Sequence, residues 1–137
     1  MKKSSDIRTG RHCVFQMHVH LVFVTKYRRH VFTKNILDAT KVIFEKICTD
    51  FDAHLVEFDG ESDHVHLLVN YPPKTTVSKL VNSMKGVSSR QLRQSHPELE
   101  QKYWKGVLWS PSYFASSCGG APISVIRHYI ENQKTPV

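Results

Sequence analysis

The chain has 137 residues, of which 40% are hydrophobic and 23% are charged, a composition typical of one compact domain. Its three cysteines, Cys13, Cys48 and Cys118, stand far apart and form neither a CxxC motif nor an even-numbered disulfide pattern. No apolar run approaches the roughly 18 residues of a membrane span. The composition therefore excludes a disulfide-rich secreted protein and a membrane protein. We expect a single domain over residues 1–137, located in the cytoplasm.

The formal net charge of +7 is distributed unevenly along the chain. Residues 1–34 carry eight basic side chains and one acidic side chain. Residues 35–63 carry two basic and eight acidic side chains, and residues 64–97 carry five basic and no acidic ones. Two basic segments separated by an acidic one favour a polyanionic partner bound on one side of the molecule. An ordinary solubilising charge distribution explains the same counts equally well.

Two hydrophobic periodicities divide the chain into expected strands and helices. In chain order these are a loose basic segment (1–10), a strand (12–25), a basic run (26–30), a helix (34–52), two strands (53–58 and 63–71), a helix capped by Thr76 or Ser78, a loop through Pro97 and Trp104, a bulged strand (107–118) and a closing helix (121–134). Gly86 marks a bend or a close approach in the second helix, and Gly119–Gly120 a flexible joint.

This order of elements predicts an α+β fold of the ferredoxin-like, split βαβ type. Its antiparallel sheet should carry the helices on one face, with one extra helix added at the C-terminus. The second sheet face is then available for a functional site, although the fold by itself implies no activity.

The sharpest local motif is His64-Val65-His66 on the third expected strand. Because side chains alternate along a strand, both imidazoles project from one face and can chelate a divalent ion together. Glu61 and Asp63 lie just upstream, where a carboxylate could ligate the ion or orient a histidine. Solvent-facing strand histidines are the more common explanation of such a pair. His18 and His20 form a second pair, and only the acidic neighbours favour the later one.

The closing helix carries Tyr129 and Gln133 four residues apart, and therefore on one face. A tyrosine there is usually an aromatic at the rim of the core. The functional alternative is a nucleophile, although a phenol of pKa about 10 is only ~0.1% ionised at neutral pH, a deficit of roughly 4 kcal/mol. A nearby cation would reduce that deficit and would also neutralise charge on a phosphodiester under attack.

Basic and aromatic residues in the two basic segments are candidates for binding an unpaired nucleic-acid strand. The expected phosphate contacts are Lys26, Arg28, Arg29, Lys79, Lys85, Arg90 and Arg93. For the tryptophans among the aromatics, packing in the core is the better explanation of each one individually. Ser88, Ser89 and Ser110 have no base and orienting partner close in sequence, and the phosphate-binding motifs (the P-loop and GxGxxG) are absent.

Five segments resemble, in the expected order, the small single-tyrosine transposases of the most compact bacterial and archaeal insertion sequences, members of the HUH endonuclease superfamily. The segments are HCVFQMHVHLVFVTKYRR, ESDHVHLLVNYPP, LVNSMKGVSSRQLR, LWSPSYF and GGAPISVIRHYIENQ. The resemblance covers residues 10–134. It implies that His64 and His66 are the metal-binding pair, Tyr129 the nucleophile, Gln133 a further metal ligand and Glu61 a carboxylate near the metal.

The resemblance further implies a mechanism and partners. Mg²⁺ or Mn²⁺ would assist Tyr129 in cleaving single-stranded DNA beside hairpins, leaving a 5′-phosphotyrosine and a free 3′-hydroxyl that later rejoins strands. Relatives act as homodimers that exchange C-terminal helices, with no membrane or small-molecule substrate. The protein would lie on the nucleoid when bound to DNA.

Three alternatives remain open. The first is a domesticated relative that nicks hairpins of repeated palindromes without moving an element. The second is a non-catalytic nucleic-acid-binding module on the same scaffold. The third is a metal-dependent phosphodiesterase that uses water and forms no covalent intermediate.

Overall fold

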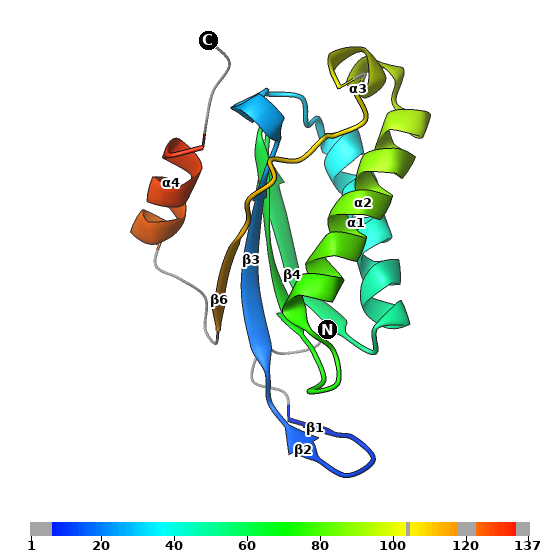
Figure 1. The fold of residues 1–137 in the computed structure, drawn as a ribbon, viewed down its shortest axis with the longest axis vertical. Helices are drawn as coiled ribbons and strands as arrows, with labels where there is room; N and C mark the ends of the chain where they lie inside the picture. Colours follow the sequence, from blue (N-terminus) through cyan, green and yellow to red (C-terminus); the bar gives the residue numbers. More distant parts are fainter. Residues whose placement is uncertain (1–6, 104, 118–122, 134–137) are drawn as a thin grey trace.

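The structure is a computed structural model that describes residues 7–103, 105–117 and 123–133 (Figure 1). Its elements are β1 (Arg8–Thr9), β2 (Val14–Phe15), β3 (His18–Val24), the 3-10 turn η1 (Lys26–Arg28), α1 (Lys34–Asp50), β4 (His54–Glu61), β5 (His64–Asn70), α2 (Val77–Ser95), α3 (Pro97–Lys102), β6 (Phe114–Ser117) and α4 (Ile123–Glu131).

The main sheet is antiparallel, with the strand order β4-β5-β3-β6. Helices α1 and α2 cover one face of this sheet, and α4 lies on the opposite side (Figure 1). The predicted α+β, split βαβ architecture with an added C-terminal helix is therefore confirmed. Among the described helices, none combines the length and the apolar character that crossing a bilayer requires.

Both long helices begin at a threonine cap. The Thr33 hydroxyl accepts a hydrogen bond from the Ile36 amide, and the Thr76 hydroxyl accepts one from the Lys79 amide. Of the two predicted alternatives, Thr76 and Ser78, Thr76 is the cap of α2. Gly86 lies inside α2 without interrupting it, and a Cβ at this position would meet no atom of the described residues within 4 Å. The predicted bend or close approach at Gly86 is therefore wrong.

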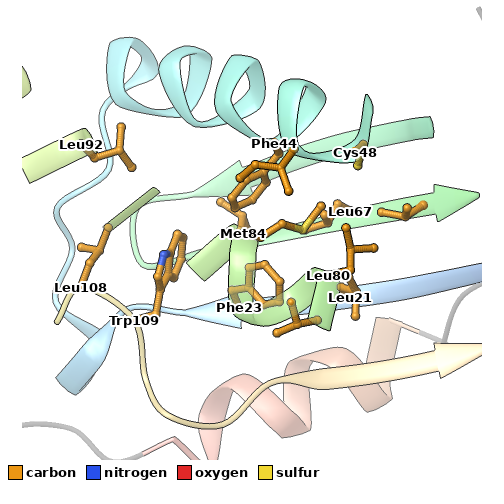
Figure 2. Close-up of a cluster of buried hydrophobic side chains, with 14 of the residues drawn as sticks. Leu21, Phe23, Phe44, Cys48, Leu67, Leu80, Met84, Leu92, Leu108 and Trp109 are labelled. Atoms are coloured by element: carbon orange, nitrogen blue, oxygen red, sulfur yellow. The ribbon is translucent and has the colours of Figure 1, made fainter. Parts of the chain in front are cut away.

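The main core lies between the sheet and α1 and α2 (Figure 2). The Phe23 ring packs edge-on against Phe44 and Trp109, with centroid separations of 5.8 and 5.7 Å. Alternation along β5 places Val65 and Leu67 in this core and turns the side chains between them to the other face. The core thereby fixes which face of the sheet carries the histidines.

A second, small hydrophobic cluster lies on that other face. Val22 and Val24 of β3 pack there against Ile130 of α4, with Phe114 and Tyr129 at the edge. The sheet separates this cluster from the main core, and among the described side chains of α4, Ile130 and Tyr129 belong to the smaller cluster.

The predicted long strand over 12–25 is divided in two. β2 pairs with β1 in a small hairpin, and β3 pairs with β5 and β6 in the main sheet. Apolar alternation continues across the break, but Val14 is 70% exposed, because the hairpin extends beyond the main sheet (Figure 1). Arg8 and Thr9, expected in a loose segment, form the first strand of this hairpin.

The region after α2 differs from the prediction in two places. Residues 97–102, expected as a loop, form α3, in which Pro97 takes the first turn and Glu98 and Glu100 lie near the helix N-terminus. The strand expected over 107–118 is reduced to a bridge between Trp109 and Thr25 and to β6. Pro111, which has no amide hydrogen, lies between these two pairings. The predicted Gly119–Gly120 joint lies outside the described residues.

Candidate functional site

A pocket of about 530 Å³ opens beside α4, on the face of the sheet that α1 and α2 leave uncovered. β5 contributes His64 and His66 to its wall, and the segment after β3 contributes Arg28 and His30. Helix α4 contributes Arg127, Ile130 and Glu131. The pocket therefore joins the predicted histidine pair to the helix that carries the predicted nucleophile.

The two histidines lie side by side because they alternate with core residues on one strand. His64 pairs with Glu61 of β4, and His66 pairs with Asp59. Their rings are stacked at a centroid distance of 6.2 Å and an interplanar angle of 26°. This is the arrangement that the His-x-His motif predicted.

A buried carboxylate orients the first histidine. The Asp63 Oδ1 atom lies 2.8 Å from His64 Nδ1, and Asp63 is only 5% exposed. Burial by itself raises the pKa of the Asp63 carboxyl, but its hydrogen bonds with His64 and Arg28 bring the pKa below its usual value. Because an ionised carboxylate only accepts hydrogen bonds, this contact places a proton on His64 Nδ1 and leaves Nε2 as the outward ring nitrogen.

Two further carboxylates approach the outer nitrogens. Glu61 Oε2 lies 3.6 Å from His64 Nε2, and Asp59 Oδ2 lies 3.9 Å from His66 Nε2. Within the described residues, no set of three or more His, Cys, Asp or Glu side chains converges on one ligating position. The donor types nevertheless fit a divalent cation, since imidazole nitrogen with carboxylate oxygen suits Mn²⁺ and similar ions.

The predicted nucleophile and its helical neighbour are not among the residues that line this pocket. The Tyr129 hydroxyl donates to Ser112 Oγ at 3.0 Å, and Gln133 Oε1 accepts from Ser110 Oγ at 3.1 Å. Burial raises the pKa of the Tyr129 phenol, and the hydrogen bond with Ser112 lowers it in part. In this arrangement, α4 borders the histidine pocket while Tyr129 and Gln133 contact the segment before β6.

The second histidine pair divides between two roles. His18 is buried, and its Nε2 lies 3.1 Å from Asn70 Nδ2. The His20 ring meets the His66 ring edge-on at 5.9 Å. Burial, followed by the neighbouring His66, lowers the pKa of the His20 imidazole. His18 is thus a structural core histidine, whereas His20 borders the candidate site.

Several predicted DNA contacts are engaged within the protein. Lys85 Nζ donates to the backbone oxygens of Ser110 and Ser112, and burial lowers the pKa of this lysine. Arg93 pairs with Glu100 at 3.0 Å. These contacts leave Lys85 and Arg93 less accessible to a phosphate than the sequence suggested.

The other predicted contacts lie at the surface or in the turn after β3. Arg90 and Lys79 are exposed on α2. Lys26 and Arg29 lie over the Tyr27 ring, at 5.4 and 5.3 Å from its centroid. Arg28 instead turns toward Asp63, with 3.3 Å between Nε and Oδ2.

The sequence did not reveal a second pocket, which is lined by basic residues, or several residues of the histidine pocket. Lys102, Tyr103 and Lys105 join Lys26 and Arg29 around a pocket of about 230 Å³. The signal was the Lys-Tyr-Trp-Lys run at residues 102–105, which was assigned to a loop. Among the residues of the histidine pocket, Arg127, His30 and Glu131 had no motif to reveal them.

Comparisons with known proteins agree with the motifs. The family model described as "Transposase IS200 like" matches residues 13–133. The ISDra2 transposase TnpA of Deinococcus radiodurans is 32% identical over 128 residues, covering 93% of this chain and 91% of the relative. The transposase of insertion sequence element IS200 from Salmonella typhimurium is 30% identical over 132 residues, covering 94% of this chain and 87% of the relative.

Solved structures give the same result. A crystal structure described as a transposase from Deinococcus radiodurans R1 matches with a TM-score of 0.86 and 34% identity, over 94% of this chain and 99% of that chain. A structure of a REP-associated tyrosine transposase bound to a REP hairpin matches with a TM-score of 0.55, over 92% of this chain and 69% of that chain. At 12% identity, this match shows a shared fold. Together with the family match over nearly the whole chain, these relatives place the protein in the IS200-like transposase family.

Proposed function

We propose that this transposase cleaves and rejoins single-stranded DNA beside hairpins, through a covalent bond between Tyr129 and a 5′-phosphate. The observation that carries the proposal is the pocket in which His64 and His66 lie side by side next to α4. Membership of the IS200-like family supplies the context, since a transposase must break and join DNA strands.

The chain's own residues have separate roles in this reaction. His64, His66 and Glu61 would hold a divalent cation, with Gln133 as a further ligand once α4 is rearranged. Such a cation, Mg²⁺ or Mn²⁺, withdraws charge from the phosphate and makes phosphorus more electrophilic. Tyr129 Oη forms the new bond to phosphorus and loses its proton, and the 3′-oxygen leaves and gains one.

Tyr129 must move to reach the pocket. Its hydroxyl bonds to Ser112, whereas the pocket is bordered by other residues of the same helix, among them Arg127 and Ile130. For the active form we adopt the arrangement that the family resemblance implies, a homodimer in which α4 of one copy supplies Tyr129 to the histidines of the other. The described apolar contacts of α4, through Ile130 and Tyr129, lie in a cluster separate from the main core, and this supports such an exchange.

Cationic residues outside the pocket would hold the DNA. Exposed Arg90 and Lys79 on α2, and Lys26 and Arg29 around Tyr27, offer phosphate contacts with an adjoining aromatic ring. This arrangement separates the groups that bind DNA from those that cleave it.

The test is a covalent-adduct assay. Single-stranded oligonucleotides carrying the palindromes that flank the gene are incubated with the protein and Mn²⁺, and the products are separated under denaturing conditions. We expect an adduct with the native chain and none with Tyr129→Phe. Tyr27→Phe removes the same hydroxyl from an exposed ring and should retain the adduct.

Two outcomes would favour other functions. Cleavage that persists in Tyr129→Phe would identify a nuclease that uses water. Binding without cleavage, over several palindromes and metals, would identify a nucleic-acid-binding module. His64→Ala and His66→Ala should abolish cleavage and keep most of the hairpin affinity, because the proposed phosphate contacts lie elsewhere.

A second candidate within the family is a hairpin-nicking protein that no longer moves an element. The same pocket would serve it, so chemistry alone does not separate the two functions. Excision and joining of a marked element in cells, with the Tyr129→Phe chain as control, distinguishes them. Nicking of palindromes without joined products would support this second candidate.

A further inference from the structure

Arg28 differs from its basic neighbours in the direction of its side chain. Tyr27 and Arg28 have φ values of 65° and 53°, in the left-handed region that few residues other than glycine adopt. This turn follows directly on β3 and brings Arg28 over the β4–β5 turn. Its guanidinium Nε lies 3.3 Å from Asp63 Oδ2, and its side chain is only 25% exposed.

Asp63 connects Arg28 to the first histidine of the pair. One carboxylate oxygen faces Arg28 at 3.3 Å, and the other faces His64 Nδ1 at 2.8 Å. The Asp63 backbone is fixed as well, because the Thr25 amide donates to its carbonyl oxygen at 2.9 Å. The carboxylate thus has little freedom to turn away from the imidazole.

We propose that Arg28 and Asp63 are positioning residues for His64, and that Arg28 is not a DNA contact. Asp63 fixes the tautomer and the ring orientation of His64, and Arg28 holds Asp63 in the position that does so. The inference rests on the proposed function in one respect, since that function gives the lone pair of His64 Nε2 a cation to bind.

The arrangement follows the general rule for ligating histidines. A carboxylate that accepts the second ring N–H fixes the outward nitrogen as the one that binds metal. Here the outward nitrogen, Nε2, faces the pocket, where Glu61 Oε2 lies 3.6 Å away. Arg28 gives the second oxygen of a nearly buried carboxylate a charged partner, which a carboxylate in that position needs.

The first experiment reads the imidazole directly, without metal or DNA. In protein labelled with ¹⁵N-histidine at pH 8, we expect His64 to show a protonated Nδ1 and an unprotonated Nε2. Asp63→Asn should shift the signals toward the other tautomer, because an amide can donate to Nδ1. Arg28→Gln should produce a smaller shift in the same direction, and Arg28→Lys should restore the native signals.

Arg90→Gln is the matched control, because Arg90 is an exposed arginine on α2 and lies outside the pocket. It should leave the His64 signals unchanged. An unaltered tautomer in both Asp63→Asn and Arg28→Gln, each verified as folded by thermal unfolding, would overturn the proposal.

The second experiment measures affinity for Mn²⁺ and for hairpin DNA by titration. Asp63→Asn should weaken Mn²⁺ binding by about 10- to 100-fold, the usual effect of losing such a partner. Arg28→Gln should weaken it less, and Arg28→Lys should remain near native. For hairpin DNA we expect the opposite ranking of the variants. Arg90→Gln should reduce the slope of log affinity against log salt concentration by about 0.7–0.9, the value for one phosphate contact, whereas Arg28→Gln should leave this slope unchanged.

The outcomes separate this inference from the proposed function. A loss of DNA affinity and salt slope in Arg28→Gln with an unchanged His64 tautomer would identify Arg28 as a DNA contact and overturn the inference. A native chain that forms no DNA adduct but shows the expected tautomer would refute the proposed function and still support the positioning of His64.

Discussion

The two glycines at Gly86 and Gly60 allow a paired prediction of opposite sign. Gly86 lies in the middle of α2, is exposed, has no positive φ, and leaves the space for a Cβ empty to 4 Å. Glycine in a helix interior is about 0.8–1.0 kcal/mol less favourable than alanine. Since no new contact opposes it, Gly86→Ala should stabilise the fold by about that amount.

The shift in melting temperature follows from the size of the chain. With about 2.1 cal/mol/K of unfolding entropy per residue, the melting temperature of a chain of this length rises by roughly 3.5 °C for each kcal/mol of added stability. Differential scanning calorimetry at fixed salt and protein concentration should therefore show Gly86→Ala melting about 2–4 °C above native. A neutral or lower melting temperature would mean that α2 needs glycine at this position, and the helix-propensity reasoning would be refuted.

Gly60→Ala is the control. A Cβ there would lie 2.8 Å from Leu37 Cδ2, 3.0 Å from the His64 carbonyl oxygen and 3.1 Å from Val65 Cγ1. The leucine could yield, but the carbonyl belongs to the β5 backbone and cannot move without displacing His64. We expect destabilisation of about 1–3 kcal/mol, the usual range for overpacking.

Three further predictions concern other parts of the molecule. Ser112→Ala removes the acceptor for the α4 tyrosine, so amide exchange in residues 127–133 should accelerate about fivefold, corresponding to ~1 kcal/mol for one hydrogen bond. Burial raises the pKa of Cys48 to about 12. Peptide mapping after iodoacetamide at pH 8 should therefore find Cys48 unlabelled while exposed Cys13 is alkylated. The hydrogen bond from Lys74 lowers the pKa of Asp52, so carboxyl ¹³C titration should give a value below the usual range that rises in Lys74→Met.

Local signals in the sequence predicted the main sheet and the long helices. The alternation in DHVHLLVNY placed His64 and His66 on one face because Val65 and Leu67 must enter the core. The Thr76 cap marked the start of α2 because its hydroxyl has a nearby amide to accept from. These features depend on neighbours a few residues apart, which a sequence displays directly.

Features decided by distant partners were missed. The break between β2 and β3 depends on which strand each half pairs with, and the alternation runs through it unchanged. The inward turn of Arg28 depends on a carboxylate 35 residues away. The run KYRRH reads as a uniform basic patch, and only the position of Asp63 beside it distinguishes Arg28 from its basic neighbours.

The two hydrophobic clusters on opposite faces of the sheet have a consequence for how the molecule opens. Among the side chains that the structure describes, those of the main core, including Phe23 and Trp109, come from elements other than α4, and Ile130 belongs to the smaller cluster. From this division we expect the last helix to open as a unit of its own, with an opening free energy below that of global unfolding. The scaffold that bears the imidazoles would then stay folded while the helix opens and closes.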